Sequence, residues 1–181
     1  KKKIMNLRNI FRSIPFLKRI YPSLFLKFSY LLNKNIFLSK FKNVYFNLDI
    51  RDPIDRSVLL FNFYEEEQIK YLIGLFKKNK INYFFDVGAN CGIYSLVISK
   101  LFPKTSTLSF EPVKSTFKKL EKNFSLNPKL KNMKKYNYGL SNKNSKLKMK
   151  ALLKKNFIQS GGYGVVNNKD NLKNLHTEFA E

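Results

Sequence analysis

Two acidic residues and a glycine-rich turn are the residues of this sequence whose types and spacing could carry out chemistry. Asp86 precedes the turn Gly88–Gly92, which has Asn90 at its centre, and Glu111 comes 19 residues after Gly92. Glycines lack a Cβ, so a ligand can approach their main chain closely. A carboxylate at the position of Asp86 can hold a cationic amino group, and Glu111 can accept hydrogen bonds from both ribose hydroxyls of an adenosine. These residues therefore predict a site for a nucleotide-like cofactor.

The elements around these residues predict how they are positioned. Asn82–Val87 is a nearly continuous apolar run, typical of a strand buried on both faces of a parallel sheet. The segments that follow alternate between helix and strand patterns: a helix over Cys91–Phe102, a strand over Thr107–Phe110, a helix over Val113–Leu126 and a strand over Met133–Leu140. This order predicts an α/β fold with a Rossmann-like, doubly wound, mostly parallel sheet and right-handed crossovers. Ligands bind such sheets at the carboxyl ends of the strands.

The residues of the turn indicate which cofactor it binds. The pattern is Gly-x-Asn-x-Gly and not the Gly-x-Gly-x-x-Gly of dinucleotide sites, and it lacks the Gly-Lys-Ser/Thr of a P-loop. A pyrophosphate requires a helix N-terminus without a nearby carboxylate, whereas Asp86 lies directly beside the turn. The combination favours a ligand with an ammonium group, such as the methionine part of S-adenosylmethionine.

Several segments between Leu48 and Ala151 resemble those of FkbM-type methyltransferases, a class I family with a Rossmann-like fold. The strongest resemblance is that of Phe85–Leu96 to the family's cofactor motif. Shorter segments are similar to other family motifs: Asp55-Arg56, Tyr64-Glu65, Phe110-Glu111-Pro112, Leu120–Asn123, Leu126-Asn127 and Gly139–Asn142. The family's later strand, with its Lys-x-Asp-x-Glu-Gly type of motif, is absent. We therefore expect the sheet to be truncated after its third core strand, with the acceptor half of the site outside this chain, and we expect a fragment that neither folds stably nor catalyses alone.

The resemblance implies an S-adenosylmethionine-dependent O-methyltransferase that acts on a hydroxyl of a sugar, a glycan or another small molecule. It places the methionine end of the cofactor against Asp86, Gly88, Asn90 and Gly92, and the ribose against Glu111. Two further residues, Gly139 and Leu140, are expected near the adenine. The catalytic base is not identified by the sequence, and no metal site is predicted.

The segment before the sheet predicts a β-hairpin. Val44–Ile50 alternates as a half-buried strand, Arg51-Asp52-Pro53 indicates a turn, and Ser57–Phe63 is a short apolar strand. Glu65–Glu67 then opens a helix, where helix capping explains Glu65 and contact with a ligand is the alternative. We divide the chain into an N-terminal helical extension, residues 1–43, and part of a methyltransferase domain, residues 44–181.

The N-terminal stretch Ile10–Leu38 alternates between apolar and basic residues and contains no apolar run long enough to span a membrane. It predicts either a helical extension packed on the domain or an amphipathic helix on a membrane surface, with contact through residues 4–38. The one cysteine, Cys91, allows no internal disulfide, which is in keeping with the cytoplasm, and its position favours packing. The expected location is cytoplasmic or peripheral to a membrane.

The net charge of +23 favours anionic partners, and a biased base composition explains the same excess of Lys. An RNA methyltransferase is therefore an alternative function, although the basic residues are spread along the chain and no RNA-binding module is visible. A non-catalytic nucleotide-binding module is another. At the C-terminal end, Lys146–Ala151 predicts an edge strand, Gly161–Gly164 a loop and Asn167–Asn174 a polar segment. His176 is expected in a polar tail, away from catalysis.

Overall fold

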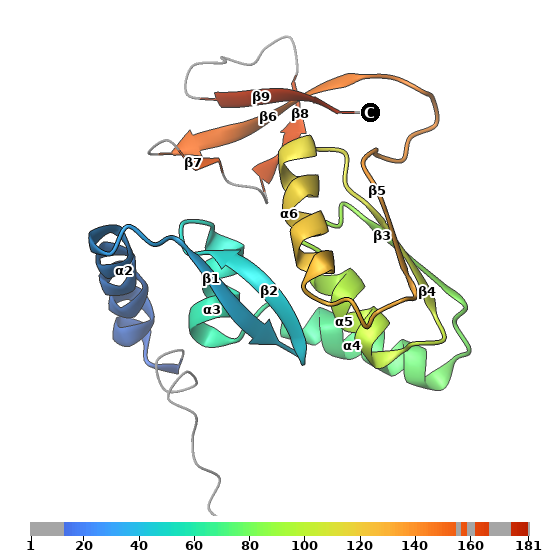
Figure 1. Ribbon diagram of the computed structural model, residues 1–181, viewed down its shortest axis with the longest axis horizontal. Coiled ribbons are helices and arrows are strands. Elements are labelled where there is room, and N and C mark those ends of the chain that lie inside the picture. The colour runs from blue at the N-terminus through green and yellow to red at the C-terminus, as the bar shows by residue number, and fades with distance from the viewer. Residues whose placement is uncertain (1–12, 155–156, 159–161, 167–174, 181) are drawn as a thin grey trace, which may run out of the picture.

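Three β-sheets organise the described residues of the computed structural model, which are 13–154, 157–158, 162–166 and 175–180 (Figure 1). The N-terminal part consists of α2 (Pro15–Leu31), the hairpin strands β1 (Ile36–Phe41) and β2 (Val44–Asp49), α3 (Pro53–Phe61) and α4 (Glu66–Lys78). The central part consists of β3 (Tyr83–Val87), α5 (Ile93–Leu101), β4 (Ser106–Phe110), α6 (Lys114–Ser125) and β5 (Met133–Tyr136). The C-terminal strands are β6 (Leu147–Lys154), β7 (Phe157–Ile158), β8 (Gly164–Val165) and β9 (Leu175–Ala180).

The central sheet is parallel, with the strand order β3-β4-β5, and a helix connects each strand to the next. This is the layout of the first half of a Rossmann-like sheet and confirms the predicted fold class. In the register, Asp86 lies beside Ser109, and Val87 lies beside Phe110, which in turn lies beside Tyr136. The carboxyl ends of β3 and β4 are therefore adjacent, as the predicted site requires.

One face of this sheet differs from the prediction. Tyr83, Phe85 and Val87 are 63%, 56% and 59% exposed, whereas Asp86 on the same strand is buried. α5 packs against β3 and β4 on the buried face. The prediction that Asn82–Val87 is buried on both faces is wrong, because an apolar run alone does not reveal which faces are covered.

The hairpin that precedes the sheet exists, but its strands differ from those predicted. β1 pairs with β2 in an antiparallel register from Ile36–Asp49 to Phe41–Val44. Ser57–Phe63 is not a strand, because most of it belongs to α3. Asp52 is the N-cap of α3 and accepts hydrogen bonds from the N–H groups of Ile54 and Asp55, and Pro53 occupies the first helical position. An Asp-Pro pair is therefore a helix start here, and its interpretation as a hairpin turn was wrong.

The N-terminal extension is helical over α2, which begins with Pro15 at a position where its missing N–H costs nothing. The helical prediction is wrong for Ile36–Phe41, which forms β1, and residues 1–12 lie outside the described residues. In the described part of the chain, no helix combines the length and hydropathy needed to cross a membrane.

The C-terminal sheet corrects two predictions. β6 pairs with β9 over Leu147–Leu152 and with β8 at Met149 and Lys150, so it has a strand on both sides and is a central strand, not an edge strand. β7 pairs with the end of β6. His176 lies on β9 opposite Ala151 and not in a polar tail. The strands that flank β6, β8 and β9, come later in the sequence, and the alternation of β6 alone does not reveal them. Gly164 belongs to β8, while residues 159–161 and 167–174 lie outside the described residues.

Candidate cofactor site

The turn between β3 and α5 has the conformation that its glycines allow. Gly88, Asn90 and Gly92 have φ angles of 79°, 49° and 87°. The N–H groups of Gly88 and Ala89 both donate to the carbonyl oxygen of Phe110, each at 2.9 Å. A Cβ on Gly92 would lie 2.5 Å from the Leu120 side chain, whereas a Cβ on Gly88 would meet nothing within 4 Å. A side chain at Gly92 would therefore force the buried Leu120 side chain of α6 to shift, whereas Gly88 leaves open space at the carboxyl end of the sheet.

Glu111 binds the turn directly. Its Oε2 accepts a hydrogen bond from the N–H of Asn90 at 2.9 Å, and its Oε1 accepts one from the N–H of Val113 at 3.0 Å. A carboxylate oxygen can accept two hydrogen bonds, so each oxygen keeps a lone pair for a ligand hydroxyl. Burial raises the pKa of Glu111, and the two backbone hydrogen bonds oppose that rise. The structure thus brings Glu111 to the Gly88–Gly92 turn, as predicted from their spacing.

Asp86 lies beneath the same turn. Its Oδ2 accepts hydrogen bonds from the N–H of Ser95, at 3.0 Å, and from the Ser95 hydroxyl. The Ser95 hydroxyl is also 2.6 Å from the hydroxyl of Ser109 on β4. Burial raises the pKa of Asp86, and its bonds to Ser95 lower it. These contacts fix the orientation of the Asp86 carboxylate at the end of β3.

A third carboxylate, that of Glu65, lies in this region. Glu65 is the N-cap residue of α4 with φ 33°, and its side chain makes no capping hydrogen bond. Instead it accepts a hydrogen bond from the hydroxyl of Tyr94, in the first turn of α5. The Tyr64 and Tyr94 rings meet edge to face with their centroids 6.0 Å apart. The capping interpretation of Glu65 is therefore wrong.

Tyr64 and Tyr94 are two residues that sequence reasoning did not assign. Burial is the main reason that the pKa of each hydroxyl is raised, and the charges of Glu65 and Asp86 add to the rise. The Tyr94 hydroxyl bonds Glu65 and the Tyr64 ring packs on Tyr94, so both tyrosines lie beside the Glu65 carboxylate. Tyr94 lies two residues after Gly92 in the first turn of α5, and no local pattern indicates its contact with Glu65.

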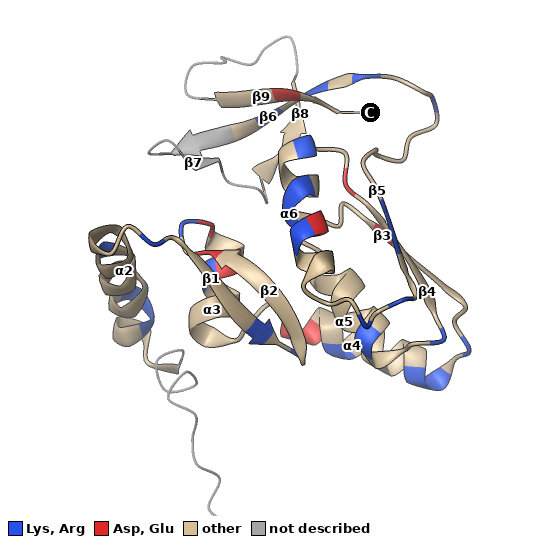
Figure 2. Cartoon of the chain, in the orientation of Figure 1, with Lys and Arg blue, Asp and Glu red and all other residues tan. Residues whose placement is uncertain are grey.

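In the part of the chain that the structure describes, no basic side chain pairs with the acids at the turn. The ion pairs of the described residues involve other acids: Asp49, Asp52, Asp55, Glu67, Glu121 and Glu178. The Asn90 Oδ1 is buried and has no hydrogen-bond partner among the described residues. Figure 2 shows Lys and Arg on most parts of the chain, which has a net charge of +23. An acceptor without a donor and acids without cations, in so basic a protein, suit a cationic ligand with hydrogen-bond donors.

Buried polar side chains hold the turn in place. Asn123 on α6 donates from Nδ2 to the carbonyl of Cys91 and accepts at Oδ1 from the N–H of Asn47 on β2, both at 2.8 Å. Asn127 bonds both the N–H and the carbonyl of Tyr45. Cys91 is 2% exposed, and burial raises the pKa of its thiol to about 12, which agrees with a packing role. α6 therefore ties the hairpin to the turn.

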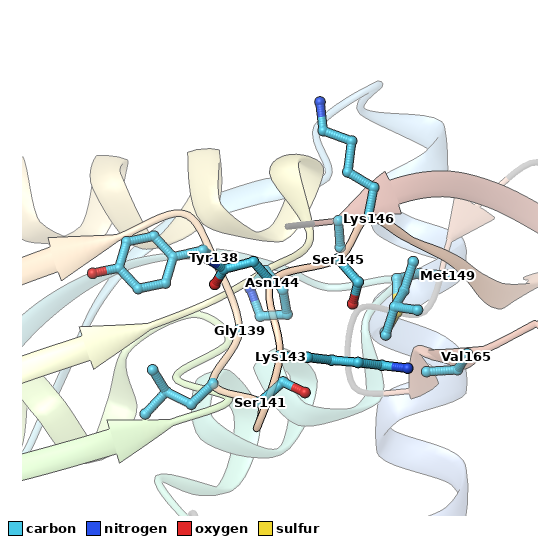
Figure 3. Close-up of a pocket in the computed structure, with 13 residues that line it drawn as sticks. Tyr138, Gly139, Ser141, Lys143, Asn144, Ser145, Lys146, Met149 and Val165 are labelled. Atoms are coloured by element: carbon cyan, nitrogen blue, oxygen red, sulfur yellow. The ribbon is translucent and has the colours of Figure 1, made fainter.

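Gly139 and Leu140 line a cavity of about 740 Å³, a volume that suits a small ligand. Pro112, which follows Glu111, lines the same cavity, whereas Asp86, Gly88, Asn90 and Gly92 do not. Asn137 donates from Nδ2 to the carbonyls of Glu111 and Pro112 and so joins the segment after β5, which contains Gly139 and Leu140, to the end of β4. Figure 3 shows Lys143 extended toward Val165 and Lys146 directed away from the cavity. The predicted adenine neighbours, Gly139 and Leu140, thus share a cavity with Pro112, the residue after Glu111.

β9 lies near the beginning of α6. Glu178 accepts hydrogen bonds from the N–H and the hydroxyl of Ser115, both at 3.2 Å, and lies 3.4 Å from the Nε2 of His176. No contact joins His176 to Asp86 or Glu111.

In the described part of the chain, no group of three or more His, Cys, Asp and Glu residues could hold a metal ion.

Comparison with known proteins gives two structural likenesses. No family model and no curated protein matches the sequence. The putative transferase PH0793 from Pyrococcus horikoshii is 20% identical with a TM-score of 0.43, and P. horikoshii TYW2 in complex with MeSAdo is 19% identical with a TM-score of 0.43. Each comparison covers 68% of this chain and 50% of the other, so the chain spans about half the length of either protein. Likeness at this level shows neither a shared family nor a shared activity, and the FkbM-type resemblance stays a prediction.

Proposed function

We propose that this chain binds S-adenosylmethionine at the Gly88–Gly92 turn. The observation that carries the proposal is the group of acids around the turn, Asp86, Glu111 and Glu65, which have no basic partner among the described residues although the chain has a net charge of +23. The ammonium of the methionine end lies against Asp86, with Glu65 and Tyr94 beside it. Glu111 accepts hydrogen bonds from the ribose hydroxyls. The adenine lies along Pro112 and Leu140.

The geometry of this chain fits such a ligand at each contact. Gly88 has no neighbour within 4 Å of its Cβ position, which leaves room for a ligand against the backbone. The Asn90 Oδ1, which has no hydrogen-bond partner among the described residues, can accept a hydrogen bond from the ligand. The edge-to-face rings of Tyr64 and Tyr94 suit a cation, because the face of an aromatic ring attracts positive charge.

We propose further that the activity is methyl transfer to a hydroxyl of a sugar, a glycan or another small molecule, as in FkbM-type enzymes. The cofactor, when bound, supplies a methyl group on a cationic sulfur. The contribution of the residues described above is to hold the cofactor in one orientation for in-line attack by the acceptor oxygen. No residue of the chain is assigned as the base that takes the hydroxyl proton.

Calorimetry on the whole chain tests the cofactor assignment. S-adenosylmethionine and S-adenosylhomocysteine are expected to bind, and Asp86→Asn is expected to weaken both. NAD and ATP are the control ligands, and Glu121→Gln, a surface change on α6, is the control variant. Binding of NAD in preference to S-adenosylhomocysteine would replace this proposal with a dinucleotide site.

RNA methylation is the second candidate, because the net charge of +23 suits a polyanionic acceptor. Transfer of labelled methyl from S-adenosylmethionine to RNA, compared with transfer to oligosaccharides, separates the two acceptors. RNA binding that weakens with salt no more steeply than that of an unrelated basic protein counts against this candidate.

A further inference from the structure

Helix α2 packs on the domain with one part of its surface and leaves another part exposed. On one side, Tyr21 packs edge to face on Phe61, with ring centroids 6.2 Å apart, and Phe25 packs on Phe37 at 5.5 Å. These contacts join α2 to α3 and to the hairpin through a small apolar cluster. The extension is therefore attached to the domain, and this packing determines which residues of α2 stay exposed.

Beside the packed part of its surface, α2 carries an exposed apolar stripe that no described residue covers. Phe16, Leu24, Phe28 and Leu31 are 70%, 59%, 57% and 81% exposed. Their spacing of 8, 4 and 3 residues places them on one side of a helix. Single exposed apolar residues are ordinary, but four on one stripe form a surface that water solvates poorly. We call these four residues the α2 stripe.

The charge around the α2 stripe has one sign. The first acidic residue of the chain is Asp49, and the preceding 48 residues contain 11 Lys and Arg. On α2 itself, Arg19 and Lys27 are exposed, and Figure 2 shows no acidic residue on this helix. A second copy of the chain would bring like charges together at such a surface. An anionic surface with an apolar interior complements both its charge and its stripe.

We propose that α2 docks this protein on anionic lipid membranes, lying in the interface plane with the α2 stripe among the acyl chains and Arg19 and Lys27 at the headgroups. Helix α2 has 17 residues and is interrupted by basic residues, so it lies on the membrane and does not cross it. The packing of Tyr21 and Phe25 on the domain brings the rest of the protein to the bilayer surface. The proposal is independent of the cofactor site.

Co-sedimentation of the whole chain with vesicles tests the proposal. Vesicles of equal parts phosphatidylglycerol and phosphatidylcholine are expected to bind the protein, and vesicles of phosphatidylcholine alone to bind it weakly. Leu24→Ser/Phe28→Ser is expected to lower the affinity for the anionic vesicles by about tenfold or more, because two apolar side chains that enter the bilayer on binding are lost. The matched control is Tyr71→Ser/Phe179→Ser, which removes two equally exposed aromatic residues from α4 and β9.

A charge change gives a second, independent readout. Arg19→Glu/Lys27→Glu is expected to weaken binding to the anionic vesicles more than Lys77→Glu/Lys78→Glu, which makes the same change of net charge on α4. Circular dichroism checks that each exposed substitution leaves the fold intact. Equal weakening by the two charge variants, or full binding by Leu24→Ser/Phe28→Ser, would assign the affinity to general basic charge and overturn the proposal. A dimer that dissociates in Leu24→Ser/Phe28→Ser, without vesicle binding by the unchanged chain, would also overturn it.

Discussion

The Oε2 of Glu111 accepts a hydrogen bond from the backbone N–H of Asn90 at 2.9 Å, so the end of β4 holds the centre of the turn that follows β3. This contact joins the two parts of the candidate site. It also means that Glu111 has a structural role before any ligand binds, since its other oxygen accepts from the N–H of Val113. A variant of Glu111 must therefore be judged on both affinity and stability.

Glu111→Gln is expected to lower the affinity for S-adenosylhomocysteine by about tenfold or more, because an amide replaces a charged acceptor of hydrogen bonds. Calorimetry gives the affinity, and urea unfolding shows how much of the change is a loss of stability. Glu121→Gln on the outer side of α6 is the control. Unchanged affinity in Glu111→Gln would show that Glu111 does not bind the ribose.

The two glycines of the turn are expected to respond differently to alanine. Both have positive φ angles, which cost an alanine about 1–2 kcal/mol. Only Gly92→Ala also places a Cβ 2.5 Å from Leu120, so we expect it to destabilise the protein by about 1–3 kcal/mol more than Gly88→Ala. Gly88→Ala is instead expected to weaken cofactor binding with little further loss of stability. Urea unfolding and calorimetry on both variants give the comparison, and equal loss of stability would contradict it.

The central sheet was predictable because its information is local. α5 and α6 carry an apolar period of helical spacing, β3 is a short apolar run, and the turn between β3 and α5 has its own glycine pattern. The adjacency of Asp86 and Glu111 followed from the rule that parallel strands end at one edge. This rule needs no knowledge of side-chain contacts.

The features that were missed depend on distant partners or on one ambiguous signal. Asp52-Pro53 suits a turn and a helix N-terminus equally, and in the structure it forms the N-terminus of α3. β1 was hidden because Ile36–Phe41 continues the apolar and basic alternation of α2. The role of Glu65 depends on Tyr94, 29 positions later, which no local pattern indicates.

Glu65→Gln is expected to weaken binding of the methionine end of the cofactor and to leave binding of the adenosine end unchanged. Affinity for S-adenosylmethionine should fall by about tenfold, since a charge next to an ammonium is lost. Affinity for 5′-methylthioadenosine, which lacks the amino acid, should not change. Tyr94→Phe should cause a smaller loss of the same kind, because it removes the hydrogen bond that orients Glu65.

Tyr71→Phe on the exposed side of α4 is the control for Tyr94→Phe. If Glu65→Gln weakens both ligands equally, Glu65 acts on the whole turn and not on the ammonium. If neither ligand binds the unchanged chain, the cofactor proposal itself is wrong.

Asp55 is expected to make the stability depend on pH. It is fully buried on α3, where its Oδ2 lies 2.8 Å from the Lys119 Nζ and accepts from the N–H of Asp49, and its Oδ1 has no partner among the described residues. Burial raises its pKa to about 6, against the opposing charge of Lys119. A raised pKa means that the folded state holds the proton more tightly than the unfolded state. The contribution of Asp55 to stability is therefore complete below its unfolded pKa, which is about 4, and is lost as the pH rises through about 6.

Urea unfolding at about pH 5 and about pH 7.5 tests this expectation, with a predicted contribution of Asp55 that is larger by about 1–2 kcal/mol at the lower pH. Asp55→Asn cannot titrate, so its free energy of unfolding should lack this part of the pH dependence. The difference between the two proteins isolates Asp55 from the other carboxylates, whose effects are common to both. Glu67→Gln, an exposed change on α4, should keep the pH dependence of the unchanged chain. If Asp55→Asn keeps it as well, the proton is bound elsewhere, and Asp55 stays ionised beside Lys119 over this range.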